Sequence, residues 1–504
     1  GAAKPAQWFF PGHRLRGSRA AAADAAGNLF VTGWDSSRGQ GVVARLDAGT
    51  GAVRWESRPA VDKGWVIAIG PDGNPVVAGR VAGLVTVTKL SGTDGSLWGG
   101  RPPPPMASGA TWLGVYAVAV DAFGAVLVRA VQDLPSSRSF LLKLGGDGAP
   151  AWQKEGTGDF ALAANGDVFF VAPVLPGEAP GWAIVRARGP DGSIAWRSHQ
   201  AEQDSGPVAL AASPDGDVVA SGIIRPLAPG IAQQTVTRTV RLVGADGAVR
   251  WRWMQAWLPA EEGVGTSFNG GNDQHAVAFD RQGAVFVTGQ HGIDMFTRRH
   301  AADTGAAQWE VRRGSGIPGG SHGVAIAVDA AGDVVVTGIT GWGYAGGIPY
   351  GDVLSARYDG ADGRLEWSAV HDGTTLSFDS GWDVVPSGDS VYVVAHMREA
   401  VAGSGIRAWK YGPGVQPSPN YQGLWWASPA GSESGWGLGI AHQGDTLFAT
   451  WFTYDDGGQP LWLVAPAMTL TDREYFAGKG DRTRGPEYGT AAFEGTAGRG
   501  GELG

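Results

Sequence analysis

The sequence predicts an all-β protein in which a unit of four short strands recurs along most of the chain. Three observations predict this: the composition is rich in glycine and tryptophan, hairpin-like segments recur, and a tryptophan ends each recurring unit. The 504 residues include 83 Gly, 30 Pro and 22 Trp, and only 17% are charged. Such a composition suits short strands joined by tight turns, because glycine inside a helix costs about 1 kcal/mol relative to alanine.

Each unit begins with apolar and small residues that alternate on both sides of an Asp-x-x-Gly or Asp-Gly turn. Clear examples are AAADAAGNLFVTG (21–33), AVDAFGAVLVR (119–129) and GVAIAVDAAGDVVVTG (323–338). Alternation with a period of two predicts strands, and aspartate and glycine favour the turn between them. We therefore expect β-hairpins whose turns hold the recurring acids, which are Asp24, Asp72, Asp121, Asp215, Asp280 and Asp329.

The unit continues with a second alternating run, a glycine turn and a tryptophan. The run reads VVARLDAGTGAVRW up to Trp55 and LLKLGGDGAPAW up to Trp152. The same ending recurs at intervals of 43 (Trp55 to Trp98) to 58 residues (Trp251 to Trp309), which is the length of a propeller blade. We expect these tryptophans on the outer strands, packed between neighbouring blades: Trp8, Trp55, Trp98, Trp152, Trp196, Trp251, Trp309 and Trp367.

The number of units predicts an eight-bladed β-propeller closed by its own N-terminus. Trp8 has no hairpin before it, whereas the hairpin at 382–396 and the strand at 405–411 have no fourth strand after them. Pairing the N-terminal strand with these three strands completes the eighth blade and removes two open sheet edges. The first domain is therefore expected to cover residues 1–411.

These repeats resemble the SBBP-type bacterial propeller repeats. The segment at 332–367, GDVVVTGITGWGYAGGIPYGDVLSARYDGADGRLEW, is similar to their GNVYVTG…YDYATIKYD…G-W pattern. The D-x-x-T-G-x-x-x-W of Asp47–Trp55 also resembles the tryptophan-docking motif of pyrroloquinoline-quinone propellers, another eight-bladed group. Dehydrogenases of that group hold the quinone beside a vicinal cysteine pair, and this chain has no cysteine. The resemblance therefore implies the fold and a binding scaffold, and we expect no cofactor.

The proline- and glycine-rich stretch at 412–420, GPGVQPSPN, predicts a linker to a separate β domain at 421–504. Its G-x-W-W, E-S-G-W-G and H-Q-G-D motifs are similar to a small β domain at the C-terminus of secreted proteobacterial proteins. That domain usually has several more strands, which leaves open whether the domain is complete here. An uncovered sheet edge would favour self-association.

The charge and composition restrict the partners. The net charge of −9 and the absence of a basic stripe disfavour nucleic acid, and no apolar window is long enough for a membrane span. The turn acids are spread around a ring, so they offer no converging set of oxygens for calcium, and we expect no metal. The first residues, Gly1-Ala2-Ala3-Lys4, are similar to an end left by signal-peptide removal. We therefore expect a secreted, extracellular or periplasmic protein.

The candidate ligand-binding residues lie on the loops of one face of the ring. In a propeller, the loops that enter the innermost strands share a face with those that join the second and third strands. In the last three blades these loops combine histidine, carboxylate, arginine and aromatic residues, a combination that suits sugars or extended polymers. The candidates are His275, His322, Asp379, Trp382, Trp342, Tyr344, Tyr350, His396 and Arg398. The alternative is that they are ordinary polar residues of a solvated face.

These features favour a non-catalytic recognition or scaffold protein of a Gram-negative bacterium, which binds a glycan or a surface protein. The alternative is a polysaccharide lyase or glycosidase, in which His275 and His322 open adjacent blades and could exchange protons with a substrate. No residue lies in a recognisable catalytic motif, so we assign none as catalytic. A quinoprotein dehydrogenase is disfavoured because the chain has no cysteine pair. Convergence of both histidines with Asp379 would favour an enzyme.

Overall fold

The computed structural model describes residues 6–10, 21–35, 40–59, 63–97, 112–132, 138–156, 158–201, 209–224, 236–256, 276–291, 294–314, 320–345, 348–371, 378–388, 390–399, 403–412, 423–425, 436–443, 446–455, 457–470, 476–482 and 498–503. Two compact units divide the chain. One unit is Lys4–Val415, and the other is Gln416–Gly504 together with Gly1–Ala3. The expected linker at 412–420 lies outside the described residues except for its first position.

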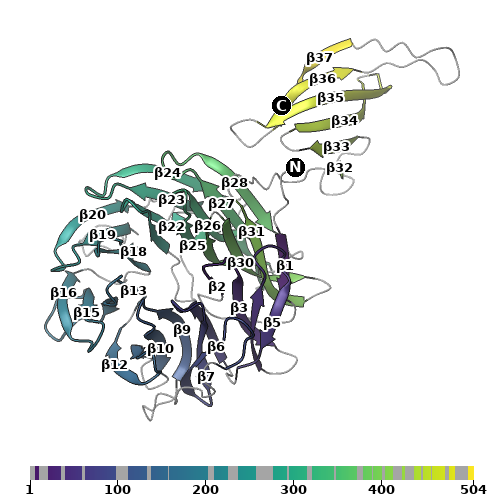
Figure 1. Cartoon of the computed structure of the whole chain (residues 1–504). Helices are drawn as coiled ribbons and strands as arrows, with labels where there is room; N and C mark the ends of the chain where they lie inside the picture. The colour runs from purple at the N-terminus through teal and green to yellow at the C-terminus, as the bar shows by residue number, and fades with distance from the viewer. Residues whose placement is uncertain are drawn as a thin grey trace. The chain divides into compact units, whose positions relative to one another are not determined.

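The first unit is an eight-bladed β-propeller, as the sequence predicts (Figure 1). Every blade is an antiparallel sheet, written here from the innermost strand outward. Blade 1 is β2 (Ala21–Ala23), β3 (Leu29–Asp35), β4 (Gln40–Leu46) and β5 (Val53–Ser57). Blade 2 has three strands within the described residues, β6 (Lys63–Ile69), β7 (Pro75–Val81) and β8 (Leu84–Lys89). Blade 3 is β9 (Trp112–Val120), β10 (Val126–Gln132), β11 (Arg138–Leu144) and β12 (Pro150–Glu155).

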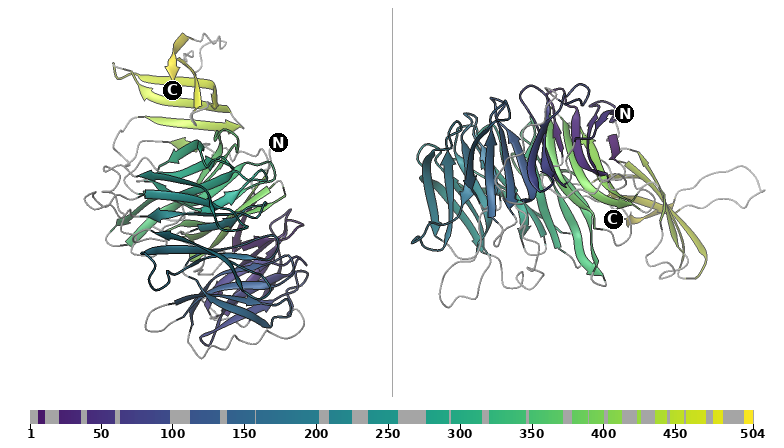
Figure 2. Two further views of the ribbon diagram at one scale, coloured as in Figure 1. Left: turned by 90° about the vertical axis from the view of Figure 1, so that its left-hand side faces the viewer. Right: turned by 90° about the horizontal axis from the view of Figure 1, so that it is seen from below.

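The remaining blades follow the same order, and Figure 2 shows their strands standing side by side around the ring. Blade 4 is β13 (Phe160–Leu162), β14 (Val168–Ala172), β15 (Gly181–Ala187) and β16 (Ile194–Ala201). Blade 5 is β17 (Ala209–Ala212), β18 (Val218–Ile224), β19 (Val236–Leu242) and β20 (Val249–Ala256). Blade 6 is β21 (Ala276–Phe279), β22 (Val285–His291), β23 (Asp294–His300) and β24 (Ala307–Arg313). Blade 7 is β25 (Gly320–Val328), β26 (Val334–Ala345), β27 (Ile348–Tyr358) and β28 (Leu365–His371).

Blade 8 combines the two ends of the propeller, and the predicted closure is confirmed. Its strands are β29 (Ser380–Ser387), β30 (Ser390–Glu399), β31 (Gly403–Tyr411) and, outermost, β1 (Ala6–Phe10). β1 runs antiparallel to β31, with Ala6 opposite Lys410 and Phe10 opposite Ile406. The Tyr392 hydroxyl donates to the Gly27 carbonyl over 2.6 Å, and Lys410 Nζ donates to the Ala48 carbonyl over 2.7 Å. These bonds join blade 8 to blade 1.

The hydrophobic core lies between the blades. The described buried residues form eight clusters, and each cluster draws its members from two neighbouring blades. One cluster, for example, joins Leu29 and Val42 of blade 1 to Tyr392 and Ile406 of blade 8. Because both faces of each blade are covered, the alternating residues of the sequence pack against different neighbours. Burial of this kind contributes about 25 cal/mol per Å² of apolar surface.

The hairpin turns explain the recurring Asp-x-x-Gly pattern. In blade 3, Asp121 Oδ1 accepts hydrogen bonds from the backbone N–H groups of Phe123 (3.0 Å) and Ala125 (2.8 Å). Gly124 has a φ of +83°, which a residue with a side chain rarely adopts. The same two backbone bonds to Oδ1 recur at Asp24, Asp280 and Asp329.

The second unit is a six-stranded antiparallel sheet in sequential order, and it contains the small β domain that the sequence predicts. Its strands are β32 (Gly423–Trp425), β33 (Gly437–Gln443), β34 (Thr446–Tyr454), β35 (Pro460–Leu470), β36 (Phe476–Arg482) and β37 (Gly498–Leu503). In the parts of both units that the structure describes, no helix has the length and apolar character needed to cross a membrane.

Candidate functional site

The hairpin between the second and third strands of blade 7 carries two of the candidate aromatic residues. Its strands have 12 and 11 residues, whereas the corresponding strands of blades 1 and 6 have seven. Tyr350 lies opposite Gly343, where a Cβ atom would come within 2.7 Å of the Tyr350 ring atom Cζ. Trp342 lies opposite Gly320 on β25. Both aromatic side chains are half-buried, so part of each ring faces solvent.

The entry to blade 8 lies against this hairpin. Gly351 forms an isolated parallel bridge with Phe378, and the Asp379 N–H donates to the Gly351 carbonyl over 2.8 Å. The Asp379 side chain is fully buried. The structure thus links β27, at the residue after Tyr350, to the segment that leads into β29.

Trp382 and His396 form a stacked pair within blade 8. Their ring centroids are 5.3 Å apart and their planes are inclined by 14°. Trp382 comes from β29 and His396 from the neighbouring strand β30, and both side chains are half-buried. Trp382 also packs against the core between blades 8 and 1, and this contact holds its ring in place.

His322 lies on β25 with only 3% of its surface exposed. Burial lowers the pKa of His322 to about 4, so the imidazole is neutral at neutral pH. A buried neutral histidine and a buried Asp379 are poorly placed to exchange protons with a dissolved polymer. His275 lies outside the described residues, as do the side chains of Tyr344 and Arg398. The candidates that the structure ties together are therefore those of blades 7 and 8.

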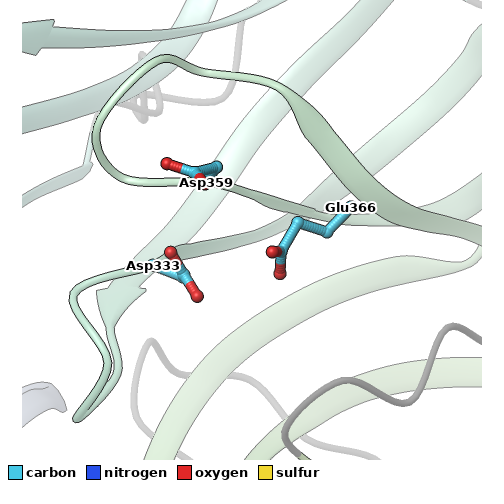
Figure 3. Close-up of side chains that lie close together, drawn as sticks. All are labelled: Asp333, Asp359 and Glu366. Carbon is cyan, nitrogen blue, oxygen red and sulfur yellow. The ribbon is translucent and has the colours of Figure 1, made fainter. Parts of the chain in front are cut away.

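A group of three carboxylates that the sequence analysis did not single out lies elsewhere in blade 7 (Figure 3). Ligand oxygens of Asp333, Asp359 and Glu366 lie within 4.8 Å of one another. The guanidinium of Arg357 already contacts this group, at 2.7 Å from both Asp333 and Glu366 and at 2.8 Å from Asp329. Burial raises the pKa of Glu366. The nearly buried arginine accounts for the gathering of acids without a metal ion.

Similar ion pairs recur in the other blades and are a feature that the sequence analysis missed. In blades 1 to 7 a lysine or arginine near the end of the third strand binds an acid at the hairpin turn. Arg241, for example, binds Asp217 at 2.9 Å and donates to the Gly283 carbonyl of blade 6 over 2.8 Å. The signal was a basic residue at a fixed place in each third strand. The pairs are Arg45–Asp24, Lys89–Asp72, Lys143–Asp121, Arg186–Asp167, Arg241–Asp215/Asp217, Arg299–Asp280 and Arg357–Asp329/Asp333.

The outer tryptophans of five blades each dock on a turn of the next blade. Trp196 Nε1 donates to the Gly244 carbonyl over 2.7 Å, and its ring lies on Gly247. The same arrangement joins Trp55 to Gly92 and Gly95, Trp152 to Gly189 and Gly192, Trp251 to Ala302 and Gly305, and Trp309 to Gly360 and Gly363.

The last blade has a different arrangement, because no turn connects β31 to β1. There Trp367 stacks on Tyr411 with ring centroids 4.3 Å apart. Trp98 and the side chain of Trp8 lie outside the described residues. The described tryptophans of the outer strands therefore join blades to one another.

Comparison with known proteins supports the fold. No protein-family model matches the chain, and no curated protein matches it. The quinohemoprotein alcohol dehydrogenase from Comamonas testosteroni is 11% identical, with a TM-score of 0.50 over 84% of this chain and 78% of that one. BamB from Moraxella catarrhalis is 15% identical, with a TM-score of 0.33 over 72% and 92%. The polysaccharide lyase Uly1 is 8% identical, with a TM-score of 0.41 over 80% and 92%.

At this level of identity, the likeness to the first of these structures shows the fold and no particular activity. The class of protein that the fold and the comparisons define is the β-propeller. The SBBP repeat type and the family of the C-terminal domain remain resemblances of the sequence.

Proposed function

We propose that this protein is a non-catalytic recognition or scaffold protein that binds a glycan or a surface protein through the blade 7–8 rim. The blade 7–8 rim consists of Trp342, Tyr350, Trp382 and His396. The observation that carries the proposal is that these half-buried rings lie on two neighbouring blades whose backbones are joined at Gly351 and Phe378. Aromatic rings on a rigid support stack on sugars or pack against a protein with little loss of conformational entropy.

The alternative of a carbohydrate-active enzyme receives less support from the geometry. General acid–base catalysis needs a titratable group within hydrogen-bond reach of the substrate. His322 and Asp379 are 3% and 0% exposed, and the low pKa of His322 removes its charge at neutral pH. Neither buried group is placed to reach a substrate in solution.

The test is loss of binding in a double variant, Trp342→Ala with Tyr350→Ala. A glycan array and a pull-down with the full chain first identify the probe, which is then titrated against both proteins. We expect at least about a tenfold loss of affinity, because one aromatic contact contributes on the order of 1–2 kcal/mol. Circular dichroism checks that the variant is folded.

A matched control removes an aromatic residue elsewhere on the ring. Tyr116 lies on β9 of blade 3 and is 40% exposed, so Tyr116→Ala deletes a comparable side chain far from the rim. This variant should bind as the unmodified protein does. A ligand whose affinity is unaffected by the double variant must bind elsewhere, and the rim would then be rejected as its site.

A further inference from the structure

We infer that the C-terminal sheet is a self-association surface, which packs against the same face of a second copy of this chain. The inference is independent of the blade 7–8 rim. It rests on one apolar face of the sheet, called here the aromatic face. The register of the strands defines its members, which are Leu424, Phe448, Phe452, Tyr454 and Trp462.

The residues of the aromatic face point to one side because paired residues of neighbouring strands share a face. Phe452 lies opposite Trp462 on β35, and their rings meet edge to face at 5.3 Å. On β34, Phe448 and Tyr454 are an even number of residues from Phe452, so they alternate to the same side. On β32, Leu424 lies opposite Gly439, which in turn lies opposite Thr450 of β34.

These side chains are exposed although they are large and apolar. Leu424 is 77% exposed, Trp462 58% and Tyr454 57%, while Phe448 and Phe452 are 42% and 41% exposed. On the opposite side of the sheet, Leu447, Ala449 and Ala465 are buried. A sheet that is apolar on both sides needs a second layer to cover each of them. Within the described residues, no such layer covers the aromatic face.

The relief of the aromatic face is suited to a copy of itself. Gly437, Gly439 and Ala441 form a shallow strip along β33, beside the higher rows of Phe448, Phe452 and Trp462. A two-fold contact places the same patch on both partners, so the rows of one copy can fill the strip of the other. Asp481, which is half-buried, lies opposite Val464 at the border of the face, and Lys479 is exposed there. The border of the aromatic face therefore carries charges of both signs.

The exposed area also fits a weak dimer. Four aromatic side chains of about 200 Å² each, exposed by roughly half, offer about 400 Å² per copy. With Leu424 and the glycine strip included, a face-to-face contact buries about 1,000 Å² in total, near the lower limit for a specific interface. We therefore expect a dissociation constant in the micromolar range, on the order of 1–100 μM.

Sedimentation velocity of the full chain between about 1 and 100 μM tests the inference, because this range brackets the expected dissociation constant. The unmodified protein should shift from monomer to dimer as its concentration rises. Phe452→Lys and Trp462→Lys should each remain monomeric, because facing copies would bury two lysines together. Phe123→Lys is the matched control: Phe123 is 73% exposed at a hairpin turn of blade 3. It should dimerise normally.

Cross-linking identifies the face in contact. The chain has no cysteine, so Thr450→Cys introduces a single thiol near the centre of the aromatic face. A short bismaleimide should convert this variant to a covalent dimer. The control Thr93→Cys, on an exposed turn of blade 2, should remain monomeric in the same reaction.

Three results would overturn the inference. The first is a monomer at every concentration. The second is a dimer that both lysine variants retain and that cross-links no better through Thr450→Cys than through Thr93→Cys. The third is a monomer that sediments with an insoluble polysaccharide unless Trp462 is changed to lysine, which would assign the aromatic face to a glycan instead.

Discussion

Gly247 and Gly73 have almost the same backbone conformation in different surroundings. Their φ angles are +76° and +75°. A Cβ atom on Gly247 would lie 2.6 Å from Cε3 of Trp196, whereas a Cβ atom on Gly73 would meet nothing within 4 Å. The pair separates the cost of a left-handed conformation from the cost of displacing a docked tryptophan.

We predict that Gly247→Ala lowers the free energy of unfolding by about 2–4 kcal/mol and that Gly73→Ala lowers it by about 1–2 kcal/mol. Both variants incur the conformational cost, and only the first one also pushes Trp196 from its turn. Urea denaturation of the two variants and the unmodified protein measures the difference. Equal losses would show that the tryptophan adapts without cost.

Buried histidines make stability depend on pH, and the two least exposed ones with a lowered pKa are His300 and His322. His300 and His322 are 0% and 3% exposed, and burial lowers the pKa of each to about 4 from its ordinary value of 6.5. Between these values the unfolded chain binds protons that the folded chain does not. The stabilisation is therefore complete above pH 6.5, falls as the pH decreases, and levels off below about 4.

We predict that each histidine contributes up to about 3 kcal/mol to this pH dependence, since one pKa unit corresponds to about 1.4 kcal/mol. His322→Phe and His300→Phe should each flatten the decline in unfolding free energy between pH 7 and pH 4. Phe123→Leu, at an exposed hairpin turn of blade 3, adds and removes no titratable group, so it is the control and should leave the slope unchanged. Parallel slopes in all the variants would exclude both buried histidines as the cause.

Residue type and spacing were enough to predict the turn role of Asp121, because aspartate and glycine have local reasons to occupy such a turn. The docking of Trp196 on Gly247 was beyond local reasoning, because its two partners belong to different blades. The basic residues of the third strands were visible in the sequence as a fixed feature. These basic residues make contacts across a sheet and between blades. The period-two alternation of the sequence carries no information about such contacts.

At the scale of elements, the closing strand β1 has the clearest consequence. It is held by pairing with β31, and blade 8 ends at β31 without it. We predict that deletion of residues 1–12 lowers the melting temperature by about 5 °C or more, since even a few kcal/mol shift it measurably. Deletion of residues 1–5 leaves β1 intact and should have little effect. Differential scanning fluorimetry measures the melting temperatures of both truncated proteins. Equal melting temperatures for the two truncations would contradict the stabilising role of β1.

Elements were predicted better than their lengths. Period-two alternation around glycine turns located the hairpins, since each strand buries residues on both faces in a regular order. The extension of the blade 7 hairpin to Ala345 was not predicted, because Gly341 and Gly343 interrupt the alternation there. That extension positions Trp342 and Tyr350, so the part of the fold that the sequence described least well is the part that forms the rim.

At the scale of the whole molecule, the two units should separate on proteolysis. The stretch at 412–420 carries three prolines and two glycines, a composition typical of extended linkers. We predict that limited proteolysis cuts near Pro417 and releases a folded propeller of about 410 residues, because blade 8 is complete without the second unit. Mass spectrometry and circular dichroism of the fragments test this. Collapse of the large fragment would show that the domain boundary is wrong.

The architecture of the whole molecule follows from repetition, which a single sequence displays directly. The candidate site depends on which rare residues of unequal blades lie together, and repetition says nothing about that. His322 illustrates the limit: its position at the opening of a blade suggested an accessible ligand, and only the structure shows that its ring is buried.

The register of the seam determines how the ring responds to force. Ala6 lies opposite Lys410 and Phe10 lies opposite Ile406, so both ends of the propeller chain leave the β1–β31 ladder at the same end. Tension applied between these ends would break the hydrogen bonds of the β1–β31 pair one after another. Tension applied to opposite ends of the two strands would instead load all the hydrogen bonds at once. The same strand that stabilises the ring against thermal unfolding would therefore separate under a modest pulling force, and the ring would open at blade 8.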